Sequence, residues 1–346
     1  MTTIRNLQTN LINLKKITKK MLIENPKTYK GQEADTIFFR PSFCGKSAEE
    51  LGIRVLYNLP VPTTVQVWSH AGNVLQKYAG GWNGGSKSKK FQKTIDMRKV
   101  KAETSFAASD YFSMVFEQIT GSADVNMGDL TGTDLEKAET ELFRRAIAES
   151  VRATMWLGDT TGQVSSFTTF NGFLKAIKDA SEEGVIDNSG MAYSQYEELD
   201  SAMLTFDTVW NAAAEELKSL RPEGNLAYFA TSDVVRLYES ELDSSTTEAA
   251  YRERIDGRAG LSYHGIPVIE VALGKYDAQQ KYGKSFCMLT DRRNMVLALN
   301  TADMPENEVR MWYNPDEMEN RQRAVFLAGA DILDTRIVSV CMIGIE

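Results

Sequence analysis

The chain has 346 residues, of which 42% are hydrophobic and 25% are charged. These proportions are typical of folded globular proteins and exclude a disordered or collagen-like chain. The three cysteines, Cys44, Cys287 and Cys341, lie far apart, which argues against a disulfide framework and favours a reducing compartment. No apolar run approaches the roughly 20 residues of a membrane-spanning helix, and the beginning of the chain lacks the apolar core of a secretory signal. We therefore expect neither export by that route nor a membrane partner.

The formal net charge of −8 conceals two basic segments in an acidic chain. Residues 1–30 carry a charge of about +6 and residues 77–101 about +7, so the remainder carries about −21. Complementary charges of this kind can steer association between copies of one chain. The alternative interpretation is that both segments are solvated faces of the protein.

Residues 1–30 are predicted to form a basic, partly helical arm that ends at Pro26. The following residues are mixed in character up to the proline-containing stretch 59–62. There the chain is expected to become extended, because neither Pro60 nor Pro62 can donate a backbone hydrogen bond.

Residues 63–100 have the pattern of a long β-hairpin. Val65 and Val67 alternate with polar residues on the first strand, and the glycine-rich stretch 80–85 is expected to form the tip. Arms of about 15 residues would reach about 50 Å. Because isolated two-stranded hairpins are marginally stable in water, we expect a neighbouring subunit to hold this one.

The clearest helix is predicted over 133–158. Thr133 and Glu136 have the spacing of a capping box, and Gly158 lies where a left-handed C-terminal cap is expected. Between these ends the apolar residues form a broad stripe. At about 1.5 Å per residue the helix would be about 36 Å long, which suits a rigid girder.

The rest of the chain is predicted to be a mixed α+β structure. A single helix is expected over 205–220, a strand over 226–230, a helix over 232–242 and a turn at His264-Gly265. Further strands are expected in five segments: 285–290, 294–300, 309–313, 323–327 and 337–343. The last of these is expected to be buried on both faces, since its polar and apolar residues alternate poorly.

Enzymatic chemistry has little support. His70 and His264 are the only histidines, and neither lies in a motif that would supply a catalytic triad or a metal site. The cysteines lack CxxC spacing, so buried, packed thiols are expected in preference to zinc ligands or nucleophiles. The stretch 80–88 departs from a phosphate-binding loop, because Ser86 separates the glycines from the following lysine and an alternating strand replaces the helix. We expect no enzyme, no metal and no cofactor.

Five further stretches stand out, in this order along the chain: Val74-Leu75-Gln76-Lys77-Tyr78 with Gly81-Trp82-Asn83, Phe143-Arg144-Arg145-Ala146-Ile147-Ala148, Met155-Trp156-Leu157-Gly158-Asp159, Asn171-Gly172-Phe173-Leu174 and Tyr263-His264-Gly265-Ile266-Pro267-Val268. Taken in this order, they resemble the major capsid proteins of tailed bacteriophages, which share the Hong Kong 97-like capsid fold with encapsulins. Among these, the chain is similar to the capsid proteins of phages of Bacteroides-like bacteria.

This resemblance implies an α+β fold divided into four parts. An N-terminal arm would comprise residues 1–58, an extended loop residues 59–102, and an axial domain residues 169–301. A peripheral domain would combine 103–168 with 302–346 and contain the long spine helix.

The resemblance also implies a function: a major capsid protein that assembles as hexamers and pentamers into an icosahedral shell around double-stranded phage DNA. Its location would be the virion, assembled in the host bacterial cytoplasm, with a scaffold, a portal and other virion proteins as partners. The extended loop would clasp a neighbouring subunit through Lys77, Trp82, Lys87, Lys89, Lys90 and Lys93. The basic arm would contact DNA or the scaffold through Lys15, Lys16, Lys19 and Lys20, and such phosphate contacts are independent of sequence.

Two alternatives stay open at this point. An encapsulin-type nanocompartment shell would have the same fold and would enclose an enzyme in place of a genome. An accessory virion structural protein, such as a tail or decoration subunit, would form rings or trimers in place of closed shells. An enzyme is the weakest interpretation, because no nucleophile, base and orienting group are recognisable together.

Overall fold

The structure is a computed structural model. It describes residues 47–58, 63–70, 75, 77–78, 88–107, 134–162, 167–182, 191–244, 261–273, 284–300 and 310–344. The predicted basic arm and Thr133 of the predicted capping box lie outside these residues. The chain divides into two compact units, one from residues 1–39, 103–143 and 310–322 and the other from residues 40–102, 144–309 and 323–346.

One sheet has five strands in the order β1-β10-β12-β11, with β4 also paired to β12. Its members are β1 (Arg54–Tyr57), β4 (Arg98–Ala107), β10 (Met295–Asn300), β11 (Arg310–Asn314) and β12 (Glu319–Ile332). β1 runs parallel to β10, and β10 runs antiparallel to β12. A side chain at Gly329 of β12 would meet the backbone oxygen of Asp96 at 2.6 Å, so the close approach of these two backbones requires glycine.

The second sheet has six strands in the order β5-β13-β9-β6-β8-β7. Its members are β5 (Ala192–Tyr196), β6 (Leu226–Thr231), β7 (Ser262–Tyr263), β8 (Ile266–Val271), β9 (Ser285–Asp291) and β13 (Val338–Ile343). Every residue of the three central strands β6, β9 and β13 is buried. The sequence therefore predicts the last strand correctly as one that is covered on both faces.

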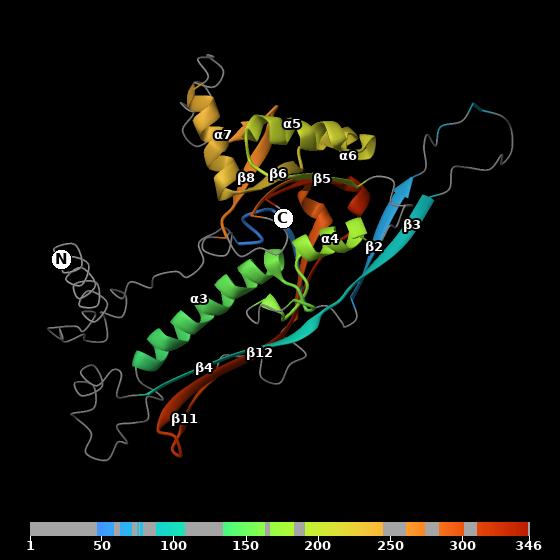
Figure 1. Cartoon of the computed structure of the whole chain (residues 1–346). Helices are drawn as coiled ribbons and strands as arrows, with labels where there is room; N and C mark the ends of the chain where they lie inside the picture. Colours follow the sequence, from blue (N-terminus) through green and yellow to red (C-terminus); the bar gives the residue numbers. More distant parts are fainter. Residues whose placement is uncertain are drawn as a thin grey trace, which may run out of the picture. The chain divides into compact units, whose positions relative to one another are not determined.

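Alternate residues along the strands of this sheet point to opposite faces and belong to two separate hydrophobic clusters, as the two-residue period of a strand requires. Phe229 and Phe286 point into a cluster with Trp156, whose ring lies 5.8 and 5.5 Å from theirs. Tyr228 and its sheet neighbours on the other face pack with Phe206 at 5.1 Å between ring centroids. Figure 1 shows the corresponding layers, with α5 and α7 over one face and α4 on the other.

The helices are α3 (Asp134–Leu157), α4 (Phe173–Glu182), α5 (Ala202–Ala212), α6 (Glu215–Ser219) and α7 (Ser232–Ser244). α3 is one uninterrupted helix of 24 residues, which confirms the helix predicted over 133–158. The left-handed cap predicted at Gly158 is wrong, because Gly158 is not among the described residues with positive φ. Glycine is needed there for space: a Cβ atom would lie 2.2 Å from the Phe170 backbone oxygen.

The single helix predicted over 205–220 is also wrong, because the chain breaks between α5 and α6. Ala213 and Ala214 have extended ψ angles of 142° and 153°. No glycine or proline marks this break, so the local sequence gives no signal for it. The break lets Ala213 and Leu217 enter the same hydrophobic cluster as α5, which burial favours over continuous helix.

The turn predicted at His264-Gly265 is confirmed. Their φ angles are 50° and 78°, the left-handed values that a tight two-residue turn between β7 and β8 demands. Two strands pair across the boundaries of the expected division of the chain. β13, within the segment 302–346, joins the six-stranded sheet, and β10, within 169–301, joins the five-stranded sheet. The four-part division itself stays a prediction.

Candidate functional site

A two-stranded ribbon, β2 (Thr63–His70) with β3 (Ser88–Ile95), is the first candidate for a functional element, and it confirms that the predicted hairpin exists. The strands are antiparallel, from the pair Thr63 and Ile95 at one end to His70 and Ser88 at the other. Among the described strands they pair only with each other. Each strand has eight residues, fewer than the arms of about 15 expected from the sequence.

One end of this ribbon is anchored in its own chain; we call the residue pairs near Thr63 and Ile95 the ribbon base. Ile95 is 1% exposed and packs in a small cluster with Val296 and Ala298 of β10, with Val65 against it. Lys93 adds an ion pair to Asp331 of β12, with 3.3 Å between nitrogen and oxygen. Burial raises the pKa of the Asp331 carboxyl, and the charge of Lys93 opposes that rise. The base is therefore held by apolar packing and charge within its own chain, whereas the sequence led us to expect that a neighbouring subunit holds the hairpin.

The far part of the segment is solvent-exposed where the structure describes it. Tyr78 is 94% exposed, and Lys77 beside it is exposed as well. Lys90 is also exposed. An exposed tyrosine ring next to lysines is a surface suited to contact with another molecule, because aromatic residues are enriched in the buried centres of interfaces.

The residues predicted to clasp a neighbour are thus only partly brought together. Lys89, Lys90 and Lys93 lie on β3, but Lys93 is occupied by Asp331 of the same chain. Trp82 and Lys87 lie outside the described residues, as do all four predicted DNA or scaffold contacts: Lys15, Lys16, Lys19 and Lys20. The role of Asp331 is missed by sequence reasoning, because nothing in its local sequence distinguishes it from the other acids of the chain.

A catalytic or metal site was sought next. The described residues hold no cluster of three or more His, Cys, Asp or Glu side chains suited to a metal ion. His264 serves the turn, where its backbone oxygen accepts a hydrogen bond from Arg221 and its ring lies 4.4 Å from that of Tyr263. Cys287 and Cys341 are buried cross-strand partners, as the expectation of packed thiols requires. None of the helices in the described part of the chain is long and apolar enough to span a membrane.

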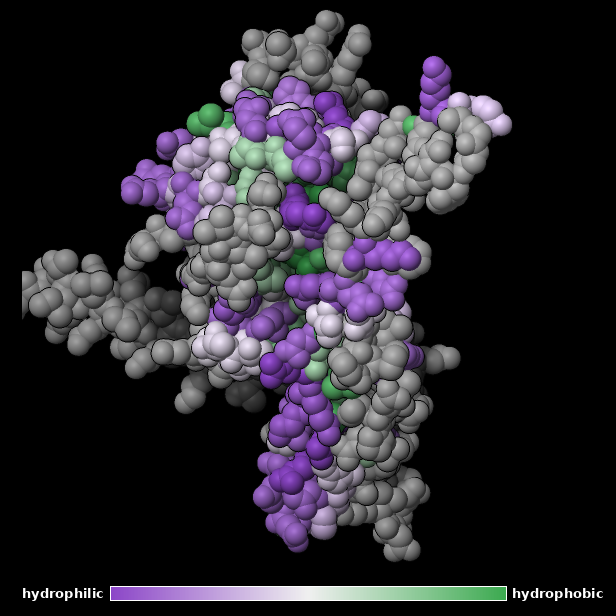
Figure 2. Space-filling model, turned by 90° about the vertical axis from the view of Figure 1, so that its right-hand side faces the viewer, coloured by the Kyte–Doolittle hydropathy of each residue, from purple (hydrophilic) through white to green (hydrophobic). Residues whose placement is uncertain are grey.

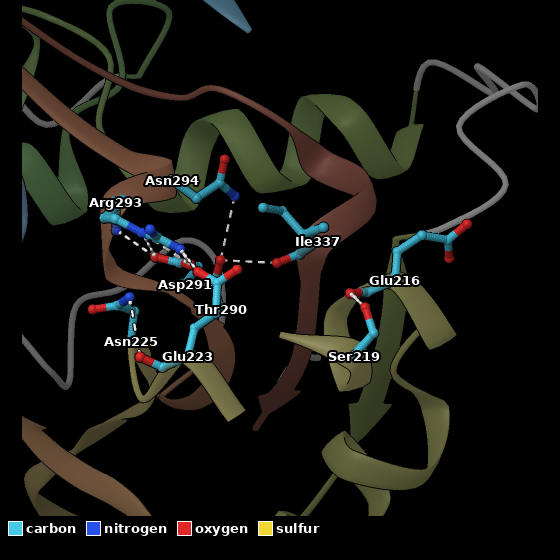
Figure 3. Close-up of polar contacts among 9 residues, drawn as sticks. All are labelled: Glu216, Ser219, Glu223, Asn225, Thr290, Asp291, Arg293, Asn294 and Ile337. Atoms are coloured by element: carbon cyan, nitrogen blue, oxygen red, sulfur yellow. Dashed lines mark hydrogen bonds and ion pairs between the residues drawn. The ribbon is translucent and has the colours of Figure 1, made fainter. Parts of the chain in front are cut away.

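A cluster of polar side chains surrounds the turn between β9 and β10 (Figure 3). Arg293 contacts Glu223 at 2.5 Å and Asp291 at 2.6 Å, and these bonds raise the pKa of its guanidinium group. Asn294 donates to the Asp334 backbone oxygen and accepts from the Asp334 amide, both at 2.8 Å. These partners satisfy one another, so the cluster braces the turn at the end of the sheet.

Figure 2 shows one face of the molecule, on which hydrophilic residues predominate among the coloured atoms and apolar residues form small patches. Such a surface is ordinary for a folded protein.

A scan against protein-family models finds no match, and a search of curated proteins finds no relative. Solved structures, in contrast, match nearly the whole chain. A chain of the satellite phage P4 procapsid including size determination (Sid) protein has a TM-score of 0.52 at 7% identity, covering 98% of both chains. A chain of Gordonia phage Cozz has a TM-score of 0.51 at 12% identity, covering 93% of this chain and 92% of that one.

At a TM-score of 0.49, a chain of the capsid of a native GTA particle is 14% identical and covers 94% of this chain and 96% of that one. The first two likenesses concern the fold, since identities this low show shared architecture alone. The chain thus has a mixed helix-and-sheet fold that is similar, over 98% of its length, to that of a chain in a phage procapsid structure.

Proposed function

We propose that this chain is a major capsid protein, which self-assembles into the icosahedral shell that encloses the double-stranded DNA of a tailed bacteriophage. The observation that carries the proposal is the fold match to a chain of the satellite phage P4 procapsid over 98% of both chains. Because the match covers almost the whole chain, few residues lie outside the shared fold and could serve another function. The anchored ribbon with an exposed far part supports it independently.

In finer detail, the proposal assigns the chain to the Hong Kong 97-like capsid fold, similar to that of phages of Bacteroides-like bacteria. α3 would be the spine helix of the peripheral domain. Strands β5 to β9 of the six-stranded sheet, with α5 and α7, would lie in the axial domain around the fivefold and sixfold axes. The parts are an arm of residues 1–58, an extended loop of 59–102, a peripheral domain of 103–168 and 302–346, and an axial domain of 169–301.

The extended loop would lie across a neighbouring subunit. Lys77, Trp82, Lys87, Lys89 and Lys90 would meet the acidic surface of that subunit, since complementary charge sets the register of such contacts. The sixth candidate, Lys93, pairs with Asp331 of its own chain, and would set the direction in which the loop leaves the subunit. The neighbour would then stabilise the part of the loop beyond the anchored base, because a two-stranded ribbon is marginal alone.

The basic arm of residues 1–30 would face packaged DNA or a scaffold protein through Lys15, Lys16, Lys19 and Lys20. Contacts to phosphate would be independent of sequence and weakened by salt. The scaffold, the portal and other virion proteins would be the remaining partners, and assembly in the host cytoplasm would place the protein in the virion.

The proposal is tested by expressing the full chain with and without the neighbouring phage products and examining it by negative-stain electron microscopy. Closed shells are expected, with sedimentation far faster than that of a 38.7 kDa monomer. Packaged DNA identifies a virion, whereas an enclosed enzyme would point to an encapsulin-type compartment. Rings or trimers would point to an accessory virion protein, and a stable monomer would contradict any shell function.

The ribbon is tested by replacing residues 71–87 with Asn-Gly, which joins the cross-strand pair His70 and Ser88 by a tight turn. This variant keeps Lys93 and Ile95, so the subunit is expected to fold with unchanged circular dichroism but to form no shells. A matched control reverses charge away from the ribbon, at the exposed Glu239 of α7 (Glu239→Lys). Shells of normal size from the shortened ribbon would contradict the clasp.

A further inference from the structure

An open groove lies between α3, the turn of residues 47–50, and strands β1, β10 and β12 of the five-stranded sheet. Its volume is about 660 Å³. The walls are apolar and come from both sides: Val55, Leu297, Leu299 and Phe326 from the sheet, and Ile147 and Val151 from α3. A groove of this size can hold a drug-sized molecule, so it has room for the side chains of a short peptide.

The walls of this groove are only partly covered by the described residues. Val55, Val151, Leu299 and Phe326 are half-buried and border the main hydrophobic core, whose members beneath them are closed to solvent. An apolar hollow of this kind, continuous with the core, marks a site where a further segment packs.

The rim carries charge of both signs. Glu49 and Glu50 stand at the end where the described chain begins, and Arg144 and Arg152 stand on α3. The acids are held in place, since Glu49 accepts a hydrogen bond from Tyr57 at 2.8 Å and Glu50 accepts one from the Ser47 amide at 2.7 Å. The groove therefore has an acidic end next to Ser47.

The chain itself supplies a segment of matching character at that acidic end. Ser47, the first described residue, lines the groove, and the preceding residues 40–46 read Arg-Pro-Ser-Phe-Cys-Gly-Lys, with two cations and no acid. Phe43 is four residues from Ser47, so its backbone lies within about 14 Å of it. A tether this short gives an effective concentration in the millimolar range, which favours this segment over a free partner at lower concentration.

We propose that residues 40–46 of the same chain dock in this groove, with the Phe43 ring against Val151 and Leu299 and the two cations toward Glu49 and Glu50. The segment then closes the apolar hollow and fixes the point from which the rest of the N-terminal part leaves the subunit. This inference does not depend on the proposed shell function, because it concerns one folded subunit and is tested on unassembled protein.

The test is disulfide trapping in the full chain. Cys44→Ser removes the nearby native thiol, and the remaining Cys287 and Cys341 are buried. Phe43→Cys is combined with Val151→Cys in the groove or, as the matched control, with Leu204→Cys on α5, which is 58% exposed. Dilute protein is oxidised with copper phenanthroline, which removes two electrons and two protons from each thiol pair.

The groove pair is expected to form an intrachain disulfide at least about tenfold faster than the control pair, as measured by non-reducing electrophoresis and peptide mass spectrometry. Predominantly interchain disulfides would show that another copy fills the groove and would overturn the proposal. Equal rates for the two pairs would overturn it as well.

A second measurement tests docking without the cysteine variants, in case these variants fold incorrectly. Phe43→Ser is expected to raise the fluorescence of an apolar surface dye by about twofold, because the groove is then uncovered. Phe43→Leu is expected to restore the wild-type signal. Unchanged dye fluorescence in a Phe43→Ser protein with wild-type circular dichroism would count against docking of this segment.

Discussion

Lys93 of β3 and Asp331 of β12 form an ion pair of 3.3 Å that links the ribbon base to the five-stranded sheet. The Asp331 side chain is 16% exposed, and its second oxygen accepts a hydrogen bond from the Ile332 amide at 2.8 Å. Because the carboxylate is largely removed from water, the cation beside it is its main source of stabilisation. The ribbon base is thus held in part by a contact between residues that are far apart in the sequence.

Replacing Lys93 with methionine is expected to destabilise the unassembled protein by about 1–3 kcal/mol at neutral pH, because a largely buried carboxylate loses its partner. The pKa of Asp331 is already raised by burial and rises further in the variant. A raised folded-state pKa means that ionisation costs stability. The loss should therefore be full above the folded pKa and disappear below the ordinary value of about 3.9.

Urea unfolding of wild type and Lys93→Met at neutral pH and at a pH below about 3.9 measures this difference. The double variant Lys93→Met with Asp331→Asn is the control, since it removes the unpaired charge and should recover much of the loss. A deficit that is independent of pH would show that the ion pair is not its cause.

Gly158→Ala is expected to destabilise the fold by about 3 kcal/mol or more, since the new methyl group would meet the Phe170 oxygen at 2.2 Å and the Thr154 oxygen at 2.6 Å. Both neighbours are backbone atoms and cannot rotate away. Gly224→Ala is the matched control: its φ is 74° but no atom lies within 4 Å of the added carbon, so only backbone strain of about 1–2 kcal/mol is expected. Equal midpoints in urea for the two variants would contradict the close-approach explanation.

Glu241 of α7 caps the beginning of α5, where its carboxylate accepts hydrogen bonds from the Ala202 amide at 2.8 Å and the Met203 amide at 2.9 Å. Glu241→Ala is expected to cost about 1–3 kcal/mol, because two amides at a helix N-terminus lose a charged acceptor. Glu239→Ala on the exposed side of the same helix should change the stability by less than about 0.5 kcal/mol. Thermal unfolding compares the two, and a similar effect of both would indicate that the helix as a whole, and not the cap, is responsible.

The two buried cysteines are expected to resist thiol reagents while the protein is folded. Burial raises the pKa of Cys287 well above its usual range and that of Cys341 to about 12, so almost no reactive thiolate exists at neutral pH. A Cys44→Ser variant should therefore show no fast-reacting thiol in buffer and both thiols in concentrated urea. Rapid labelling of either cysteine in the folded protein would contradict the packed sheet around β9 and β13.

Much of the fold could be predicted locally because its elements are long and strongly patterned. The girder helix, the ribbon, the buried final strand and the turn at His264 follow from spacing, apolar runs and turn chemistry. The break between α5 and α6 could not be predicted, since residues 211–215 are all compatible with helix. The reason for glycine at position 158 could not be predicted either. The sequence places Gly158 at a helix end, but only the neighbouring backbone of Phe170 explains why no side chain fits there.

By itself, the sequence determined the long helix, the ribbon and the buried last strand, and that the charge is divided between basic and acidic segments, since periodicity and composition are local properties. Only the tertiary structure decided that β10 and β13 join different sheets, that Lys93 is held by Asp331, and that an apolar groove opens beside Ser47. The physical reason is that strand pairing, ion pairs and cavities depend on contacts between distant residues, and no local pattern specifies which of many similar side chains will meet.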